Sequence, residues 1–203
     1  EGCTDTILRQ VDELGRMVEE FSTFARMPKP SMATFDLAEL VRQVAFSQQM
    51  VSPDLKIDVD IQPGAVSYRG DERLLGQALQ NLIKNAAEAI ARLPADTDET
   101  GAMAITLSES DDGRMSVTIV DNGPGFPDTN RQRLLEPYVT TREKGTGLGL
   151  AIVNRIIMDH GGTLLLHDRT DGRRGANVVV SLPIQDLDLS PPDARPERES
   201  QLV

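Results

Sequence analysis

Residues 115–126 read MSVTIVDNGPGF, an alternating apolar stretch that runs directly into a loop with two glycines. The alternation over Met115–Val120 predicts a half-buried strand. The glycines allow positive φ angles and close approach of a ligand to the backbone. Asp121 ends this strand, where its carboxylate can accept a hydrogen bond from an amino group such as the exocyclic amine of adenine. A plain Asp-Asn-Gly turn is the alternative interpretation.

A long helix predicted over residues 72–92 carries a second polar feature. At about 100° per residue, its core stripe comprises Leu75, Leu79, Leu82, Ala86 and Ile90. Asn81, Asn85 and Glu88 share another face, about 140° from that stripe. Asparagine is a poor helix former, and amide oxygens suit Mg²⁺, which takes few protein ligands besides water and phosphate. The face is therefore either a Mg²⁺ site or a solvated surface.

A third feature is KGTGLGL at residues 144–150, which opens a helix predicted over 147–160. Glycines followed by a helix N-terminus form an anion cradle of free N–H groups. The spacing fits neither the dinucleotide-binding nor the P-loop pattern. Arg142 and Lys144 are placed to clamp phosphates, or are simply solvated charges.

The N-terminal residues 1–27 predict one amphipathic helix. Its apolar positions follow a heptad seam of Ile7, Val11, Leu14, Val18, Phe21 and Ala25. This helix either docks on its own domain or belongs to a bundle whose partner helix lies outside the chain. A Pro-rich hinge at 28–34 follows, then a domain at 35–184 and a disordered acidic tail at 185–203.

Periodicity and turn signals predict the remaining elements. Asp36 with Glu39 indicates the start of a helix that runs to about Met50, and Asp111-Asp112-Gly113 indicates a hairpin. Strands are expected at 56–62, 66–68, 102–109, 114–120, 163–168 and 177–182, with 66–68 as a short partner of 56–62, and a short helix near 129–135. Helices in one layer and a meandering sheet in the other predict an α+β fold, a two-layer α/β sandwich.

The composition argues against several classes of function. A net charge of −11 argues against a nucleic-acid groove or an anionic membrane as partner. One cysteine and two histidines make neither an internal disulfide nor a zinc cluster. No apolar run approaches the roughly 18 residues that span a bilayer. We expect a soluble, cytoplasmic chain in which His160 and His167 are structural.

Four motifs, in this order, resemble the ATP-binding domain of sensor histidine kinases in the GHKL (Bergerat) superfamily. The motifs are NLIKNA at 81–86 for the N box, DNGPG at 121–125 for the first glycine box, EPYVTT at 136–141 for the F box and GTGLGL at 145–150 for the second glycine box. The sequence from residue 136 onwards is most similar to that of nitrogen-regulation sensors of the NtrB/NtrY kind. FSTFAR at 21–26 looks like the end of their second dimerisation helix. The resemblance implies a Bergerat fold, a mixed sheet covered by helices.

The resemblance also implies ATP and Mg²⁺ as cofactors and a role for each motif. Asn85 would hold Mg²⁺ with Asn81 assisting, Asp121 would read the adenine amine, and residues 136–146 would form the ATP lid. Catalytic roles fall to Asn81, Asn85 and Lys144. The implied nucleotide-binding residues are Asn81, Asn85, Glu88, Asp121, Gly123, Gly125, Tyr138, Thr141, Arg142, Lys144, Gly145, Thr146, Gly147, Leu148 and Gly149.

The implied activity is transfer of the ATP γ-phosphoryl group to a histidine and thence to the receiver domain of a response regulator. The implied parent protein is a homodimer through its dimerisation helices. In the family the phosphoacceptor lies on a first dimerisation helix, in a context that neither His160 nor His167 has. We therefore expect this chain to bind ATP without autophosphorylation. The signal, the cognate regulator and any inner-membrane anchor of the parent stay open.

Two other interpretations stay open beside the kinase. A hydrolytic GHKL ATPase would carry a glutamate four residues before the metal asparagine, where this chain has Asn81, although Glu88 lies nearby. A non-catalytic nucleotide-binding or partner-binding module would lose the Mg²⁺ dependence of nucleotide affinity. Some relatives have a basic residue where this chain has Glu88, so phosphate neutralisation would rest on Arg142 and Lys144.

Overall fold

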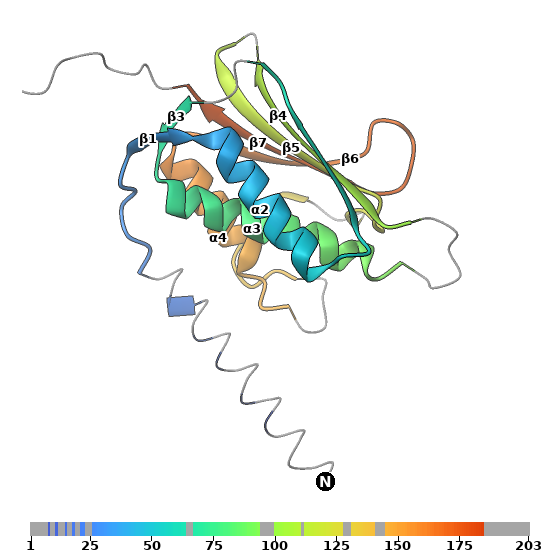
Figure 1. Ribbon diagram of the computed structural model, residues 1–203. Coiled ribbons are helices and arrows are strands. Elements are labelled where there is room, and N and C mark those ends of the chain that lie inside the picture. The colour runs from blue at the N-terminus through green and yellow to red at the C-terminus, as the bar shows by residue number, and fades with distance from the viewer. Residues whose placement is uncertain are drawn as a thin grey trace, which may run out of the picture.

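The computed structural model describes residues 8, 11, 15, 18, 21–22, 26–63, 67–93, 100–110, 112–127, 131–140 and 145–184. The elements within them are β1 (Ala33–Asp36), α2 (Leu37–Val51), β2 (Lys56–Ile61), β3 (Ser67–Gly70), α3 (Glu72–Ile90), β4 (Ala102–Ser110), β5 (Arg114–Asp121), the 3₁₀ helix η1 (Arg131–Leu135), α4 (Gly149–Asp159), β6 (Thr163–Asp168) and β7 (Ala176–Pro183). Figure 1 shows two layers, with α2, α3 and α4 on one face of the main sheet. The predicted two-layer α+β sandwich is confirmed.

The main sheet is mixed, with strand order β2-β4-β5-β7-β6. Strand β2 runs parallel to β4, with Lys56 opposite Ala102, whereas the other neighbouring pairs are antiparallel. A parallel pair needs a long crossover, and here α3 lies within it. The predicted hairpin joins β4 and β5, with Gly113 at a φ of 70°.

The pairing of β3 differs from the sequence prediction. Residues 67–70 do not pair with β2, so the prediction of 66–68 as its partner is wrong. Strand β3 instead pairs antiparallel with β1 in a separate two-stranded sheet. The physical reason is burial of Tyr68, which is only 2% exposed and meets the Phe35 ring edge to face, with the ring centroids 6.1 Å apart.

The helix starts follow the predicted caps, with two shifts. The Asp36 and Asp71 carboxylates accept hydrogen bonds from backbone N–H groups in the first turns of α2 and α3. The short helix predicted near 129–135 is the 3₁₀ helix η1. Helix α4 begins at Gly149, two residues later than predicted, because Gly147 has a φ of 69° and lies outside the helical region.

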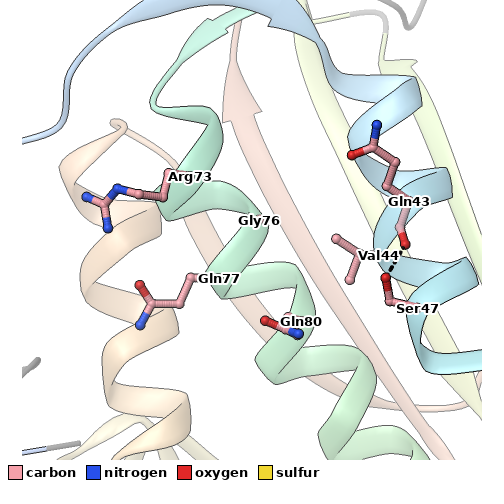
Figure 2. A pocket seen from close by; sticks show the side chains of 7 residues that line it. All are labelled: Gln43, Val44, Ser47, Arg73, Gly76, Gln77 and Gln80. Carbon is pink, nitrogen blue, oxygen red and sulfur yellow. Dashed lines mark hydrogen bonds between the residues drawn. The ribbon is translucent and has the colours of Figure 1, made fainter. Parts of the chain in front are cut away.

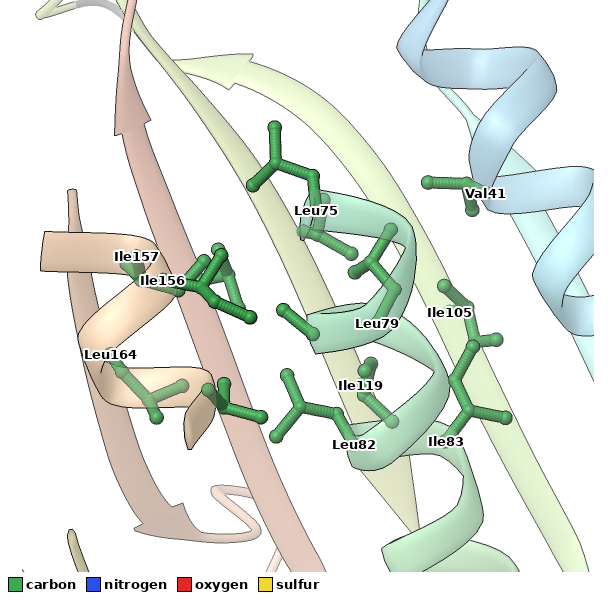
Figure 3. Packing of buried hydrophobic residues seen from close by; sticks show 14 of the residues in the cluster. Val41, Leu75, Leu79, Leu82, Ile83, Ile105, Ile119, Ile156, Ile157 and Leu164 are labelled. Atoms are coloured by element: carbon green, nitrogen blue, oxygen red, sulfur yellow. The ribbon is translucent and has the colours of Figure 1, made fainter. Parts of the chain in front are cut away.

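The hydrophobic core lies between the helices and the sheet. The predicted α3 stripe of Leu75, Leu79, Leu82, Ala86 and Ile90 is buried throughout. Figure 3 shows Leu79 and Leu82 of α3 lying among Ile156 of α4 and Ile119 of β5. Inward-facing residues alternate along β5 up to the buried Asp121. This packing sets α3 and α4 against the strand whose end carries the candidate site.

A buried hydrogen-bond network joins the C-terminus of α4 to the N-terminus of α3. The Asp71 N–H donates to His160 Nε2 at 3.0 Å, and His160 Nδ1 lies 2.7 Å from the Ile156 carbonyl oxygen. Because Nε2 accepts, Nδ1 is the ring nitrogen that donates to the Ile156 carbonyl oxygen. The Asp71 carboxylate also accepts from the Ser31 N–H at 2.9 Å, which ties the segment before β1 to the domain. His160, 1% exposed, has the structural role predicted for it.

Replacing Asp71 with asparagine is expected to lower the free energy of unfolding by about 1–2 kcal/mol at pH 7. The amide oxygen can still cap α3, but the amide nitrogen cannot accept from the Ser31 N–H. Burial raises the pKa of Asp71, yet hydrogen bonds from the Ser31 and Leu74 N–H groups, together with nearby charge such as that of Arg73, hold this pKa below 3.8. The carboxylate therefore stabilises fully above about pH 5, and its contribution is lost as the pH falls below 3.8 toward the folded-state pKa. Urea unfolding at pH 7 and pH 3 measures the difference, and a gap between the two proteins that does not shrink at pH 3 contradicts the explanation.

Two predictions about the chain ends fall largely outside the described residues. Of the heptad seam, Val11, Val18 and Phe21 are described, and all three are exposed. The predicted tail at 185–203 lies outside, and the hinge at 28–34 stays a prediction, although β1 already begins at Ala33. Among the helices of the described residues, none has the length and apolar character needed to cross a membrane.

Candidate nucleotide-binding site

Asp121, the last residue of β5, is the buried carboxylate of the site. Asp121 is only 3% exposed. Oδ1 accepts hydrogen bonds from the Gly123 N–H at 2.8 Å and the Ala176 N–H at 3.3 Å. Within the described ranges no donor contacts Oδ2, so one carboxylate oxygen remains for the amino group of a ligand.

The ionisation of Asp121 reflects opposing effects. Burial raises the pKa of Asp121 above 3.8, whereas the Gly123 and Ala176 N–H groups and the Arg169 charge lower it. Burial has the larger effect. A buried carboxylate with a perturbed pKa beside a glycine loop is typical of a functional site.

The glycines after Asp121 are required by close packing. A Cβ on Gly123 would lie 3.1 Å from the Ala89 Cβ of α3, so the loop packs about one helical turn beyond Asn85. Gly125 has a φ of 82°, and a Cβ there would lie 3.1 Å from the Gly175 carbonyl oxygen. The loop is therefore held between α3 and the turn that joins β6 to β7.

The polar face of α3 carries Asn81, Asn85 and Glu88, each partly exposed. The Glu88 carboxylate lies 4.0 Å from the Lys84 ammonium group in an exposed ion pair. The described part of the chain contains no group of three or more His, Cys, Asp or Glu that could hold a metal ion. An amide oxygen such as that of Asn85 nevertheless fits Mg²⁺, because phosphates and waters supply most of its ligands.

The second glycine box forms the N-terminus of α4. Its N-cap residue, Leu148, makes no side-chain cap within the described residues, and the Leu148 N–H donates to Thr146 Oγ1 at 3.3 Å. A Cβ on Gly149 would meet no atom of the described residues within 4 Å, so among them this first turn is open. Uncapped N–H groups at the positive end of the helix dipole suit an anion such as phosphate.

Tyr138 and Gly147 join the two sides of the predicted lid. The Tyr138 N–H donates to the Gly147 carbonyl oxygen at 3.1 Å. A Cβ on Gly147 would lie 2.6 Å from the Tyr138 carbonyl carbon, and both residues have left-handed φ angles. Three predicted residues, Thr141, Arg142 and Lys144, lie outside the described residues, so their roles stay predictions.

Sequence reasoning missed three neighbours of Asp121. Arg169 Nη1 donates to the Asp121 carbonyl oxygen at 3.4 Å, Gly175 packs against that carbonyl, and Ala176 contacts the carboxylate. The available sequence signal is Gly175, which follows Arg173 and Arg174. No pattern in the neighbouring sequence indicates that this turn lies against β5.

A pocket of about 390 Å³ lies elsewhere, between α2 and α3. Figure 2 shows its lining of Gln43, Val44, Ser47, Arg73, Gly76, Gln77 and Gln80. None of these residues belongs to the four motifs. The pocket is therefore separate from the candidate site.

The mixed five-stranded sheet with helices on one face is the fold of GHKL-type ATP-binding domains. A family model described as histidine kinase-, DNA gyrase B-, and HSP90-like ATPase matches residues 70–186, and the chain belongs to this family.

Similar proteins narrow the class to histidine kinases. The chain is 47% identical over 192 residues to nitrogen regulation protein NtrY of Azorhizobium caulinodans, covering 95% of this chain and 24% of that protein. It is 33% identical over 181 residues to sensor histidine kinase ZraS of Klebsiella oxytoca, covering 87% and 37%. The solved structure of full-length ShkA in complex with AMPPNP superposes with a TM-score of 0.71 at 30% identity, covering 88% of this chain and 38% of that one. The chain thus spans only a part of these proteins and corresponds to their ATPase-type catalytic domain.

Proposed function

We propose that this chain is the catalytic part of a sensor histidine kinase that transfers the γ-phosphoryl group of ATP to a histidine and then signals to a response regulator. The observation that carries the proposal is the buried carboxylate of Asp121 in the first glycine box, which accepts hydrogen bonds from the Gly123 and Ala176 N–H groups. Family membership and the similarity to named sensor kinases support it.

Each part of the site has a proposed role. Asp121 accepts from the adenine amine, and Gly123 and Gly125 shape the pocket around it. The α4 N-terminus, from Gly145 to Gly149, receives phosphate oxygens. Asn85, with Asn81 assisting, holds Mg²⁺, which neutralises phosphate charge when bound. Phosphoryl transfer needs positioning and charge stabilisation rather than covalent work by the protein.

The lid residues and Glu88 complete the proposed site. Arg142 and Lys144 neutralise the phosphates, because Glu88 occupies the α3 position where some relatives have a basic residue. Tyr138, Thr141 and Thr146 line the nucleotide from the lid segment. Tyr138 is 63% exposed, so its ring is accessible to a ligand.

The phosphoacceptor and the partners are also proposals. His160 is buried with both ring nitrogens engaged. His167 lies on the exposed side of β6 and is followed by Asp168, but Gly172 stands where a His-Asp-x-x-x-Pro pattern would place proline. We place the acceptor histidine on another helix of the full protein. The exposed Val11, Val18 and Phe21 fit a homodimeric helix bundle, and the receiver domain of a response regulator is the proposed second substrate.

A hydrolytic ATPase is less well supported. Activation of water would need a carboxylate four residues before Asn85, and Asn81 occupies that position. Glu88 lies on the same face but is paired with Lys84. Phosphoryl transfer to a histidine therefore fits the site better than hydrolysis.

Thermal unfolding with and without Mg²⁺-ATP tests the proposal. Ligand at about 100 times its Kd adds about 2.7 kcal/mol of stability, which raises the Tm of a chain of this size by about 5–10 °C. The Asn85→Ala variant is expected to lose most of the Mg²⁺-dependent shift. Gln80→Ala, on an exposed position of α3, is the control and should keep it.

The outcomes separate the proposals. A wild-type protein that melts cooperatively with no shift contradicts ATP binding, and the partner-binding interpretation then replaces it. A normal shift in Asn85→Ala contradicts the metal assignment alone. A shift independent of Mg²⁺ favours a non-catalytic nucleotide-binding module.

A further inference from the structure

The end of β6 holds the first glycine box from both sides. Asp168, its last residue, forms an ion pair with Arg131 of η1, and the Arg131 guanidinium lies over the Phe126 ring, 5.9 Å from its centroid. The next residue, Arg169, donates from Nη1 to the Asp121 carbonyl oxygen at 3.4 Å. Arg169 thus contacts the start of the loop over 121–126, and Asp168 is connected to the end of that loop through Arg131.

Arg169 is itself fixed by a carboxylate. Its Nε donates to Asp171 Oδ1 at 3.0 Å and its Nη2 to Asp171 Oδ2 at 2.5 Å, a bidentate pair. The Arg169 side chain is only 17% exposed. Hydrogen bonding from Arg169 lowers the pKa of Asp171 to about 2, so the pair is charged at neutral pH. The Arg169 guanidinium is therefore held in place by Asp171.

The same turn contacts Asp121 at three points. Gly175 carries no side chain where a Cβ would lie 1.9 Å from the Asp121 carbonyl oxygen and 2.7 Å from the Arg169 Cδ. The Ala176 N–H binds Oδ1 of the carboxylate. Arg169 supplies the third contact, and it is the one that brings a full positive charge toward a buried carboxylate.

We propose that Arg169, held by Asp171, is a positioning residue that fixes Asp121 for recognition of the adenine base. This inference rests on the proposed ATP site and deepens it. Arg169 acts through Asp121, whose proposed partner is the adenine amine, so we expect its effect at the base end of the nucleotide. Its charge also favours the ionised carboxylate, which is the form that accepts from the adenine amine.

The test compares two probes, Mg²⁺-ATP and Mg²⁺-bound inorganic triphosphate, by calorimetric titration of the 203-residue chain. In Arg169→Ala we expect ATP affinity to fall by about tenfold, the effect of one lost charge-assisted hydrogen bond, with triphosphate affinity unchanged. Arg169→Lys keeps the positive charge but lacks the planar guanidinium with its several N–H donors, and should recover part of the lost affinity. Asp171→Asn weakens the bidentate pair that holds Arg169. It should also lower ATP affinity, but less than Arg169→Ala does.

Arg173→Ala is the matched control. Arg173 also approaches Asp171, at 3.9 Å, but its side chain is 80% exposed, so neither affinity should change. Thermal unfolding without nucleotide checks that each variant is folded. If Arg169→Ala does not fold, Asp171→Asn provides the test. Equal losses for ATP and triphosphate, or no loss for ATP in either variant, overturn the inference while the wild type still binds ATP. A wild type that binds neither probe overturns the proposed function as well.

Discussion

Replacing Gly175 with alanine is expected to lower the free energy of unfolding by about 3 kcal/mol or more and to abolish nucleotide binding. Gly175 has a φ of 138°, a conformation that side chains rarely adopt. An added Cβ would also lie 1.9 Å from the Asp121 carbonyl oxygen. Relief requires the end of β5 to separate from the start of β7, so the strain falls directly on the site. Urea unfolding and ATP titration measure the two effects.

Gly172→Ala is the matched control for this variant. Gly172 lies in the same turn with a φ of 72°, but a Cβ there would have no neighbour within 4 Å in the described part of the chain. Backbone strain alone should cost about 1 kcal/mol and leave ATP affinity unchanged. Equal destabilisation by the two variants would show that the close approach of Gly175 to Asp121 has no energetic consequence, contrary to this account.

The elements that the sequence predicted best are those with a strong local pattern. The α3 stripe and its Asp71 cap are visible within about twenty residues, and so is the alternation of β5 that ends at Asp121. Asn85 drew attention because two asparagines on one helix face are unfavourable without a role. For these residues, local propensity and tertiary packing favour the same structure, which is why pattern alone located them.

Pairing partners distant in sequence were not predictable in the same way. Alternation marks a strand but does not say whether its neighbour is parallel, so the pairing of β2 with β4 could not be read from residues 56–62. Strand β1 has only four residues and forms because Phe35 packs on Tyr68. Its existence depends on a side chain about thirty residues away, and no local signal precedes it.

The environment of Asp121 shows the same limit within the site. The aspartate and its glycines are contiguous, but Ala176 and Arg169 lie 55 and 48 residues further along the chain. They reach Asp121 only because β5 pairs with β7 and β7 with β6. A strand register that is set by the whole core thus decides which donors meet the carboxylate, and the sequence motif contains only some of the residues that contact Asp121.

Asp121→Asn is expected to weaken ATP binding by about 10- to 100-fold, the equivalent of one charge-assisted hydrogen bond at about 1.4 kcal/mol per factor of ten. The amide oxygen can still accept from the Gly123 and Ala176 N–H groups, so the loop keeps its support. What is lost is an acceptor for the adenine amine, because the amide nitrogen is itself a donor. Calorimetric titration at pH 7.5 measures the loss. Asp58→Asn, an exposed carboxylate paired with Lys56 on β2, is the matched control and should bind ATP normally.

The pH dependence of binding gives an independent check on the same residue. Because burial raises the pKa of Asp121, the ionised form that accepts from adenine is lost as the pH falls toward a value above 3.8. Wild-type affinity for ATP should therefore decline on acidification earlier than an exposed aspartate would allow, whereas Asp121→Asn should lack this component. Arg169 opposes the effect of burial, so its removal should move the decline to higher pH. An identical pH profile for wild type and Asp121→Asn would mean that the carboxylate does not contact the base.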